Sequence, residues 1–319
     1  MFRAANRPRA QGGGGCGLQL WRDSFGWCPF SQQAQLHLEE KGVAYQVRKA
    51  PLTLYRVGDR DEEFLRDSPE GMVPALRVLG EGQEPAPPAP AVGSVAVGAA
   101  GVRAFIEDHC EGPPLLRCAG VSHCMVKAYL DLAGSLERQL HALVGAAASA
   151  ERCEEVAAAE RFLLATLEDI DLALSEIEDG PYFFGSTFTV VDIAFAPWVD
   201  RAAALLGWLC NRSVRGGLFP ALDGWLAAME ARPAHRNLRL DDDTIVRIAV
   251  ASQPALATGQ PSLSVTSAAA SAVCGAEAAQ CLAACRAGVA ALAARRAPKA
   301  SPHALDGLLR AAAAGALGE

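Results

Sequence analysis

The chain has 319 residues, of which 51% are hydrophobic and 20% charged, so it can bury a sizeable core and is not wholly disordered. Its net charge of −7 lacks the basic excess typical of a nucleic-acid surface, so we expect no nucleic-acid partner. No apolar stretch reaches about 18 residues without a charge, a proline or a run of glycine and alanine, so we expect no membrane span. The length suggests roughly two domains.

The first segment, residues 1–17, carries three arginines, no acidic residue and a run of four glycines. This composition predicts a flexible lead, with a faint likeness to the end of an organelle transit peptide. A plain disordered extension explains it equally well. We therefore expect a cytoplasmic protein, with the plastid as the alternative location.

The folded part is expected to begin with a strand, a helix and a second strand. Residues 18–21 alternate between apolar and polar side chains and predict the first strand. Pro29 suits the first position of a helix that extends to about residue 41, and Gly42 ends it. Residues 43–47 predict the second strand. A right-handed crossover between the two strands follows.

The next segments predict a further strand between two helices. Residues 60–67 predict a short helix, and residues 72–78 predict a strand with Pro74 at its start, since proline cannot donate to a sheet ladder. A solvated loop rich in proline, alanine and glycine spans residues 80–93. Residues 99–109 predict the second of the helices.

Strand signals stop at about residue 115, and only helices are predicted beyond it. Thr189 starts one of them with a sequence that resembles a capping box. The predicted helices cover residues 121–145, 151–178, 189–207 and 219–231. The fold class is therefore an α/β domain over residues 18–112, followed by an all-helical domain over residues 115–251.

The C-terminal tail, residues 252–319, is rich in alanine and contains no aromatic residue. It is unlikely to pack a core, so we expect it to be disordered or a frayed helix. The acidic run at residues 241–243, just before it, is interpreted as a charged turn.

Ten cysteines are scattered along the chain without a CxxC pair or a secretory signal, which indicates a reducing compartment. Most of them are expected to be small buried apolar groups. Cys110, Cys118 and Cys124, with His109 and His123, offer five soft ligands within a short stretch. Their spacing matches no zinc template, so we expect helix packing there and no metal.

Cys28 differs from the other cysteines because it directly precedes the helix that starts at Pro29. Free backbone N–H groups and the helix dipole favour a negative charge at such a position, and the thiolate is the reactive form of cysteine. The Ser31 hydroxyl could donate to the same sulfur. A buried, inert cysteine in the first turn is the alternative, and position alone leaves both open.

Three separated motifs in register resemble the glutathione S-transferase superfamily over about residues 18–251. The segment LWRDSFGWCPFSQQAQLHLEEKGVAYQV is similar to the first half of its thioredoxin-like domain, and FLRDSPEGMVPALRV to its Val-Pro element. GPYFFGSTFTVVDIAFAPWVDR and FPALDGWLAAMEARPAHR are similar to its helical domain. The cysteine resembles the cysteinyl classes, such as omega, lambda, iota and dehydroascorbate reductase, and its surroundings are most similar to lambda and iota-like proteins.

The resemblance implies a glutathione site with glutathione as co-substrate. Cys28 would form the mixed disulfide with glutathione, within the motif that continues through Pro29, Phe30 and Ser31. Pro74 would follow a cis peptide bond, and the backbone of the residue before it, Val73, would pair with the cysteinyl part of glutathione.

One departure from the family pattern concerns the glutamyl end of glutathione. The family usually places Glu-Ser where this chain has Gly98 and Ala99. Neither side chain can bind an ammonium or a carboxylate. Each lost charge-assisted hydrogen bond is worth about 1.5–3 kcal/mol, so a tenfold or greater loss of affinity is expected.

The first interpretation is therefore an enzyme, a glutathione-dependent thiol transferase acting on a small thiol or disulfide substrate without a metal. The rival is a non-catalytic binding protein on the same fold, in which Cys28 is a vestige or a redox-sensitive contact. A conjugating transferase ranks third, since cysteine at this position favours disulfide chemistry. A monomer and a homodimer are both compatible with the sequence.

Overall fold

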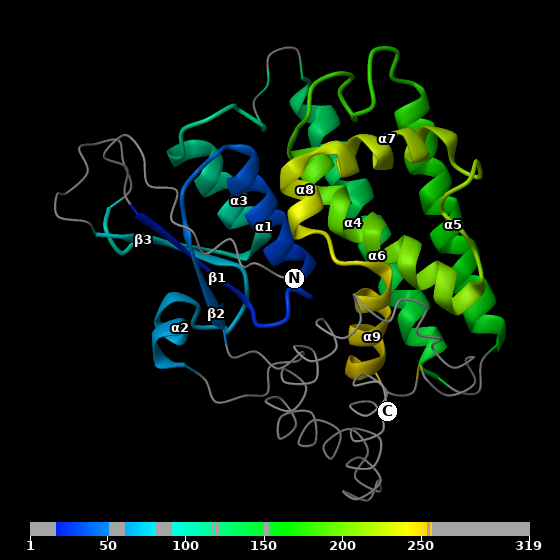
Figure 1. The fold of residues 1–319 in the computed structure, drawn as a ribbon, viewed down its shortest axis with the longest axis horizontal. Coiled ribbons are helices and arrows are strands. Elements are labelled where there is room, and N and C mark those ends of the chain that lie inside the picture. The colour runs from blue at the N-terminus through cyan, green and yellow to red at the C-terminus, as the bar shows by residue number, and fades with distance from the viewer. Residues whose placement is uncertain are drawn as a thin grey trace, which may run out of the picture.

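A computed structural model describes residues 17–50, 61–80, 91–116, 118, 121–149, 153–253 and 256. The predicted N-terminal lead, most of the loop at 80–93 and the tail beyond residue 253 lie outside the described residues, apart from residue 256. So do four cysteines, Cys16, Cys274, Cys281 and Cys285. The described part confirms the predicted fold class, a small sheet with flanking helices followed by a helical domain (Figure 1).

The sheet has four strands in the order β2-β1-β3-β4. Strand β1 pairs in parallel with β2, and β3 is antiparallel to both β1 and β4. The strands are β1 (Gly17–Asp23), β2 (Gln46–Ala50), β3 (Ala75–Leu79) and β4 (Val95–Val97). The parallel pair is joined through helix α1 (Pro29–Glu40), so the predicted strand-helix-strand unit is present.

Two strands differ from the sequence prediction. The second strand was expected at residues 43–47 but occupies Gln46–Ala50, and β4 was not predicted. Strand β2 is an edge strand in which only Ala50 is fully buried, so apolar side chains do not mark its position. Strand β4 has three residues and is held by its backbone pairing with β3. The positions of both strands depend on the strands they pair with, and a local sequence pattern does not contain this information.

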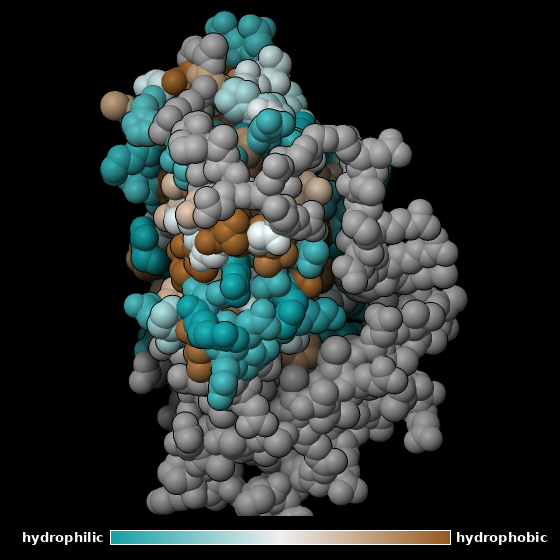
Figure 2. Space-filling view, turned by 90° about the vertical axis from the view of Figure 1, so that its left-hand side faces the viewer, coloured by the Kyte–Doolittle hydropathy of each residue, from teal (hydrophilic) through white to brown (hydrophobic). Residues whose placement is uncertain are grey.

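Helices flank the sheet on two sides. Helix α1 and helix α3 (Gly98–His109) lie side by side toward the helical domain, whereas α2 (Glu62–Asp67) lies away from it (Figure 1). The outer face of this domain is mainly hydrophilic, with apolar side chains in small separate patches (Figure 2). Among the described residues of this domain, its exposed large apolar side chains are Met72, Val92 and Val97.

The helical domain follows the sheet and contains two helices that the sequence did not predict. The acidic run expected to form a turn starts a helix instead, because the Asp241 side chain accepts from the Thr244 N–H as an N-cap and the next two aspartates lie in its first turn. The described helices are α4 (His123–Ala147), α5 (Cys153–Ser175), α6 (Val190–Cys210), α7 (Pro220–Ala231), α8 (Pro233–Leu238) and α9 (Asp242–Ser252). Helices α8 and α9 are the two additions.

Helix α6 is the centre of the helical domain's core and also contacts α1. By length and composition, it is the one described helix that could cross a membrane, but 72% of its most apolar window is buried inside the protein. Its start is the predicted capping box of Thr189 and Asp192. Asp192 also accepts from Trp225 Nε1 at 2.9 Å, and burial raises the pKa of this carboxyl to about 6. The capping box therefore joins α6 to α7.

Candidate functional site around Cys28

Cys28 is the N-cap residue of α1, as the sequence predicted. Its backbone is extended, and its carbonyl accepts the first helical hydrogen bond from Gln32 N at 3.0 Å. The sulfur faces the loop before β3, where Sγ lies 3.9 Å from the carbonyl oxygen of Val73. The Val73–Pro74 peptide bond is cis. The structure thus brings Cys28, Val73 and Pro74 together at one end of the sheet.

The loop before Cys28 is held by the end of β1. Asp23 Oδ2 accepts from the backbone N–H of Trp27 at 2.6 Å, and Ser24 Oγ donates to the carbonyl of Ala50 at 2.7 Å. Gly26 makes the turn between them with φ at +74°, a conformation that favours glycine. These contacts place Cys28 directly beyond the carboxyl end of the first strand.

The pKa of the Cys28 thiol is raised, contrary to the expectation of an easily ionised cysteine. Burial raises this pKa most, and the nearby Asp23 carboxylate raises it further. The backbone N–H groups of Ser31 and Phe30 act in the predicted direction and lower it. Part of the Cys28 residue is exposed, but protein surrounds its sulfur closely. The helix N-terminus therefore acts as predicted but is outweighed.

The other residues of the motif lie around the same helix start. Pro29 is at the first helical position, and Phe30 meets the edge of Trp198 on α6 at 5.5 Å between ring centroids. Ser31 is fully buried. Its hydroxyl is close enough to the sulfur to lower the Cys28 pKa, yet Ser31 Oγ makes no well-formed hydrogen bond to any described group.

Gly98 and Ala99 form the first positions of α3, beside the cis peptide. The Gly98 N–H donates to the carbonyl oxygen of Pro74 at 2.8 Å, so the start of α3 is anchored to the loop that faces Cys28. Gly98 has φ at +77°, and a Cβ added there would meet no other atom. Contact with neighbouring atoms therefore does not explain the absence of a Cβ at position 98.

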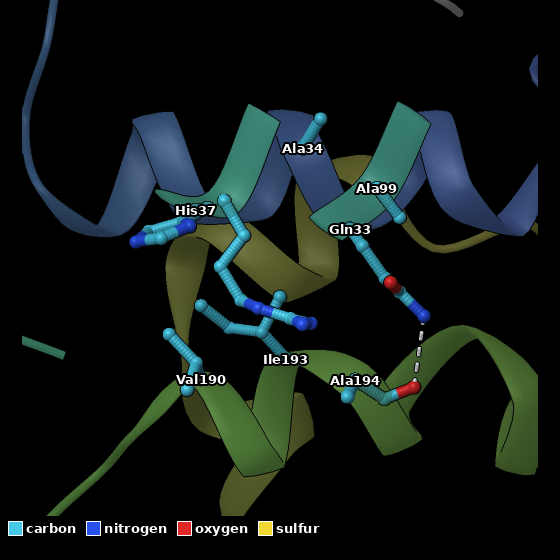
Figure 3. Close-up of a pocket in the computed structure, with 8 residues that line it drawn as sticks. Gln33, Ala34, His37, Ala99, Val190, Ile193 and Ala194 are labelled. Atoms are coloured by element: carbon cyan, nitrogen blue, oxygen red, sulfur yellow. Dashed lines mark hydrogen bonds between the residues drawn. The ribbon is translucent and has the colours of Figure 1, made fainter. Parts of the chain in front are cut away.

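A small cavity lies nearby, between α1, α3 and α6 (Figure 3). Its volume of about 10 Å³ has room for about one water molecule. In one wall the Gln33 side-chain amide donates to the carbonyl of Ala194 at 3.0 Å, which links the two domains. Ala99 and His37 contribute to other walls. This cavity is too small for a tripeptide, and Cys28 does not line it.

The remaining cysteines do not form a second site in the described part of the chain. The expectation that most are buried is wrong for those described, since Cys110, Cys118 and Cys210 are half-buried and Cys124 is exposed. Burial raises the pKa of Cys110 and of Cys210 to about 11. No group of three or more His, Cys, Asp and Glu residues suited to a metal occurs among the described residues.

Two charged residues near Cys28 were missed by the sequence analysis. Asp23 lies five positions before the cysteine, at the end of β1 and outside the helix that Cys28 precedes. Arg201 comes from α6 and donates to the carbonyl of Trp27. The one signal for Arg201 in the sequence is that it is the single basic residue of a mostly apolar helix.

Two family models match the chain. The model of the glutathione S-transferase N-terminal domain matches residues 27–90, and that of the glutathione S-transferase C-terminal domain matches residues 147–228. The first match contains the Cys28 and Val-Pro motifs, and the second contains α6 with its capping box. Both halves of the chain are thus similar to the corresponding halves of one family.

The chain is similar to several curated proteins, among them these two from Arabidopsis thaliana. Glutathione S-transferase L2, chloroplastic, is 24% identical over 69% of this chain, and the match spans 65% of that protein's length, slightly less than two thirds. Glutathione S-transferase DHAR2 is 26% identical over 70% of this chain and 89% of its own length. Both belong to classes that the motif around Cys28 resembles.

Among solved structures, glutathione transferase Omega 3C from Trametes versicolor has a similar fold. The TM-score is 0.57 at 24% identity, with 72% of this chain and 88% of that chain covered. This similarity concerns the fold alone. It agrees with the arrangement of sheet and helices described above.

Proposed function

Because the chain belongs to the glutathione S-transferase superfamily through both of its domains, we propose that it is a glutathione-dependent thiol transferase that works through Cys28. The observation that carries the proposal is the position of the sulfur. Cys28 Sγ is at the N-terminus of α1 and lies 3.9 Å from the carbonyl oxygen of Val73, whose backbone would pair with an extended peptide such as glutathione. The relatives of the lambda and dehydroascorbate reductase classes support the same chemistry.

The proposed reaction is two successive thiol–disulfide exchanges. The Cys28 thiolate attacks the glutathione sulfur of a mixed disulfide between glutathione and a substrate. A new S–S bond forms between Cys28 and glutathione as the old one breaks, and the substrate leaves as a thiolate that takes up a proton. The thiolate of a second glutathione then attacks the Cys28 adduct, which releases oxidised glutathione and restores Cys28. The net reaction reduces the substrate to its thiol and consumes one reduced glutathione, which leaves in oxidised glutathione together with the glutathionyl group of the mixed disulfide.

The residues around Cys28 have distinct parts in this proposal. The N–H groups of Phe30 and Ser31 stabilise the thiolate both as it attacks and as it leaves. Serine at position 31, three residues after the cysteine, means that Cys28 cannot close a disulfide within its own motif. A second glutathione is therefore required to complete the cycle.

A non-catalytic binding protein is the second candidate, and two observations favour it. Burial raises the pKa of Cys28, which reduces the thiolate fraction at neutral pH. The start of α3 offers Gly98 and Ala99, with no side chain for the glutamyl end of glutathione. In that case the fold would present a partner-binding surface, and Cys28 would take part in no catalytic cycle.

The test is brief exposure of the full chain to oxidised glutathione, followed by peptide-resolved mass spectrometry. We expect selective glutathionylation of Cys28, reversed by reduced glutathione, and no such adduct in Cys28→Ser. Cys110→Ser is the matched control, because Cys110 is also half-buried and has a raised pKa but lies at the far end of α3. It should keep the Cys28 adduct. Adducts distributed over many cysteines without preference for Cys28 would contradict the proposal and favour the binding protein.

A further inference from the structure

Arg201 is a fully buried arginine that connects the helical domain to the start of α1. It lies on α6 with only 2% of its surface exposed. Arg201 Nη2 donates to the carbonyl oxygen of Trp27 at 2.5 Å, and Nη1 donates to Gln32 Oε1 at 3.0 Å. One acceptor directly precedes Cys28 and the other follows it by one helical turn. The guanidinium therefore binds the backbone just before the cysteine and a side chain one turn after it.

This guanidinium has no carboxylate partner among the described residues. Its other acceptor is the carbonyl of Pro197, and its Nε is buried without a hydrogen bond. The adjacent Asp200 is already bound on both oxygens, by His235 at 3.1 Å and by Arg239 at 3.0 Å. A buried arginine that donates only to neutral oxygens is an incompletely compensated charge, which is costly in a protein interior.

The Cys28 sulfur is one of the groups whose charge affects the pKa of Arg201. Burial lowers the pKa of Arg201 to about 10, which still leaves it protonated at neutral pH. Asp200, the Cys28 sulfur and Asp23 act in the opposite direction because their negative charges favour the protonated guanidinium. Of these three, Asp200 is engaged elsewhere and Asp23 is bound by the N–H of Trp27. The cysteine sulfur is therefore the remaining group, and it can balance the charge of Arg201 only as a thiolate.

We propose that Arg201 is a positioning residue for Cys28, which fixes the peptide before the cysteine and places a buried positive charge near its sulfur. This inference rests on the proposed thiol chemistry and adds a requirement to it. The helical domain does not only cover the site but also supplies the charge that ionisation of the cysteine needs. Asp23, at the end of β1, opposes ionisation of the cysteine.

A second arginine of the helical domain offers a matched control. Arg232 binds Glu40 at the other end of α1, with Nε 2.8 Å from Oε1, and its guanidinium stacks on Phe188. Helix α1 has 12 residues, so its two ends are about 18 Å apart. Both arginines thus hold the same helix from the same domain, but of the two only Arg201 binds the residue next to Cys28.

The experiment measures the apparent pKa of Cys28 in the full chain, from the pH dependence of its alkylation by iodoacetamide read on the Cys28 peptide. We expect Arg201→Gln to raise this pKa by about 1 unit or more, since it removes an opposite charge but keeps a donor for Trp27. Arg201→Lys should restore most of the shift, and Arg232→Gln should leave the pKa of the wild type. Circular dichroism at the same temperature checks that each variant is folded.

An unchanged pKa in folded Arg201→Gln would overturn the inference, and so would an equal rise in Arg232→Gln. If Arg201→Gln does not fold, Gln32→Leu replaces it, because it removes one of the three acceptors that fix Arg201. A smaller rise in the same direction is then expected, and no rise contradicts the inference. The alkylation measurement requires no glutathione, so it tests Arg201 separately from the proposed function. If Arg201→Gln raises the Cys28 pKa in a protein without thiol transferase activity, the proposed function is refuted but the role of Arg201 is supported.

Discussion

The chemistry of Cys28 is set by a balance between neighbours that act in opposite directions. The N–H groups at the start of α1 favour the thiolate, whereas burial and the carboxylate of Asp23 oppose it. Asp23 has 7% of its surface exposed, and its Oδ1 has no hydrogen-bond partner among the described residues. The protein thus keeps an incompletely satisfied negative charge beside its candidate nucleophile. Removing this charge should reveal the contribution of the helix N-terminus.

Asp23→Asn is expected to lower the apparent pKa of Cys28 by about 0.5–1 unit, because the negative charge that opposes ionisation is lost. The amide oxygen of asparagine can still accept from the N–H of Trp27, so the loop should keep its shape. Alkylation of the Cys28 peptide at pH 7 should accordingly become faster. The measurement is the rate of iodoacetamide labelling between pH 6 and pH 10.

Asp67→Asn is the control for this substitution. Asp67 is also buried in the α/β domain, but its carboxylate binds Trp21 Nε1 at 2.7 Å and Arg77 instead of the loop before Cys28. The labelling rate of Cys28 should stay unchanged in this variant. If both variants accelerate labelling equally, general loosening of the domain rather than the charge of Asp23 is the cause.

At the scale of elements, the start of α3 is the weak point of the candidate glutathione site. Its backbone is anchored to the cis peptide through the Gly98 N–H, but it presents no polar side chain there. A glutamate at position 98 would have to adopt φ at +77°, which costs a residue with a Cβ about 1–2 kcal/mol. Serine at position 99 carries no such cost. Position 99 is therefore the better place to restore affinity.

Ala99→Ser is expected to tighten glutathione binding about tenfold, because a hydroxyl at the helix start can donate to a carboxylate of the ligand. Isothermal titration calorimetry with reduced glutathione measures the change. Ala100→Ser, one position further and exposed, is the control and should bind as the wild type does. Equal affinities of all three proteins would show that the glutamyl end of glutathione does not lie at α3.

At the scale of the whole molecule, Glu107 joins the two domains behind the site. Its carboxylate binds His37 of α1 at 2.8 Å and Lys41, the C-cap residue of α1, at 3.3 Å. It also accepts from the backbone N–H groups of Leu115 and Leu116, which lie in the connection to the helical domain. Burial by itself would raise the pKa of Glu107, but the bonds from His37 and Leu116 and the charge of Lys41 outweigh it and hold the pKa at about 2.

Glu107→Gln is expected to destabilise the protein by about 3 kcal/mol at neutral pH, since the buried ammonium of Lys41 loses its counter-charge. The folded-state pKa lies below the ordinary value of 4.5, so the carboxylate's contribution is complete above pH 4.5 and is lost as the pH falls toward 2. Urea unfolding at several pH values measures this. A difference between wild type and variant that stays constant down to pH 2.5 would contradict the interpretation.

Local patterns in the sequence were sufficient for several features of the fold. The proline at the first position of α1, the glycine after it and the Thr189 capping box depend on neighbouring residues in the chain, so their geometry follows from the local sequence. The long helices of the second half are periodic enough to be recognised. Strand β4 has three residues and helix α8 has six, and their packing partners rather than their own patterns decide them. Helix α9 does carry a local signal, the N-cap Asp241, which the sequence analysis interpreted as part of a turn.

For the site, the sequence by itself determined that Cys28 caps a helix and that a Val-Pro element belongs to the same domain. The tertiary structure decided the electrostatic outcome. The raised pKa of Cys28 depends on burial and on Asp23, and the grip of Arg201 on Trp27 joins residues 174 positions apart. Burial and contacts between distant segments exist only once the chain is packed, so no local pattern could contain them.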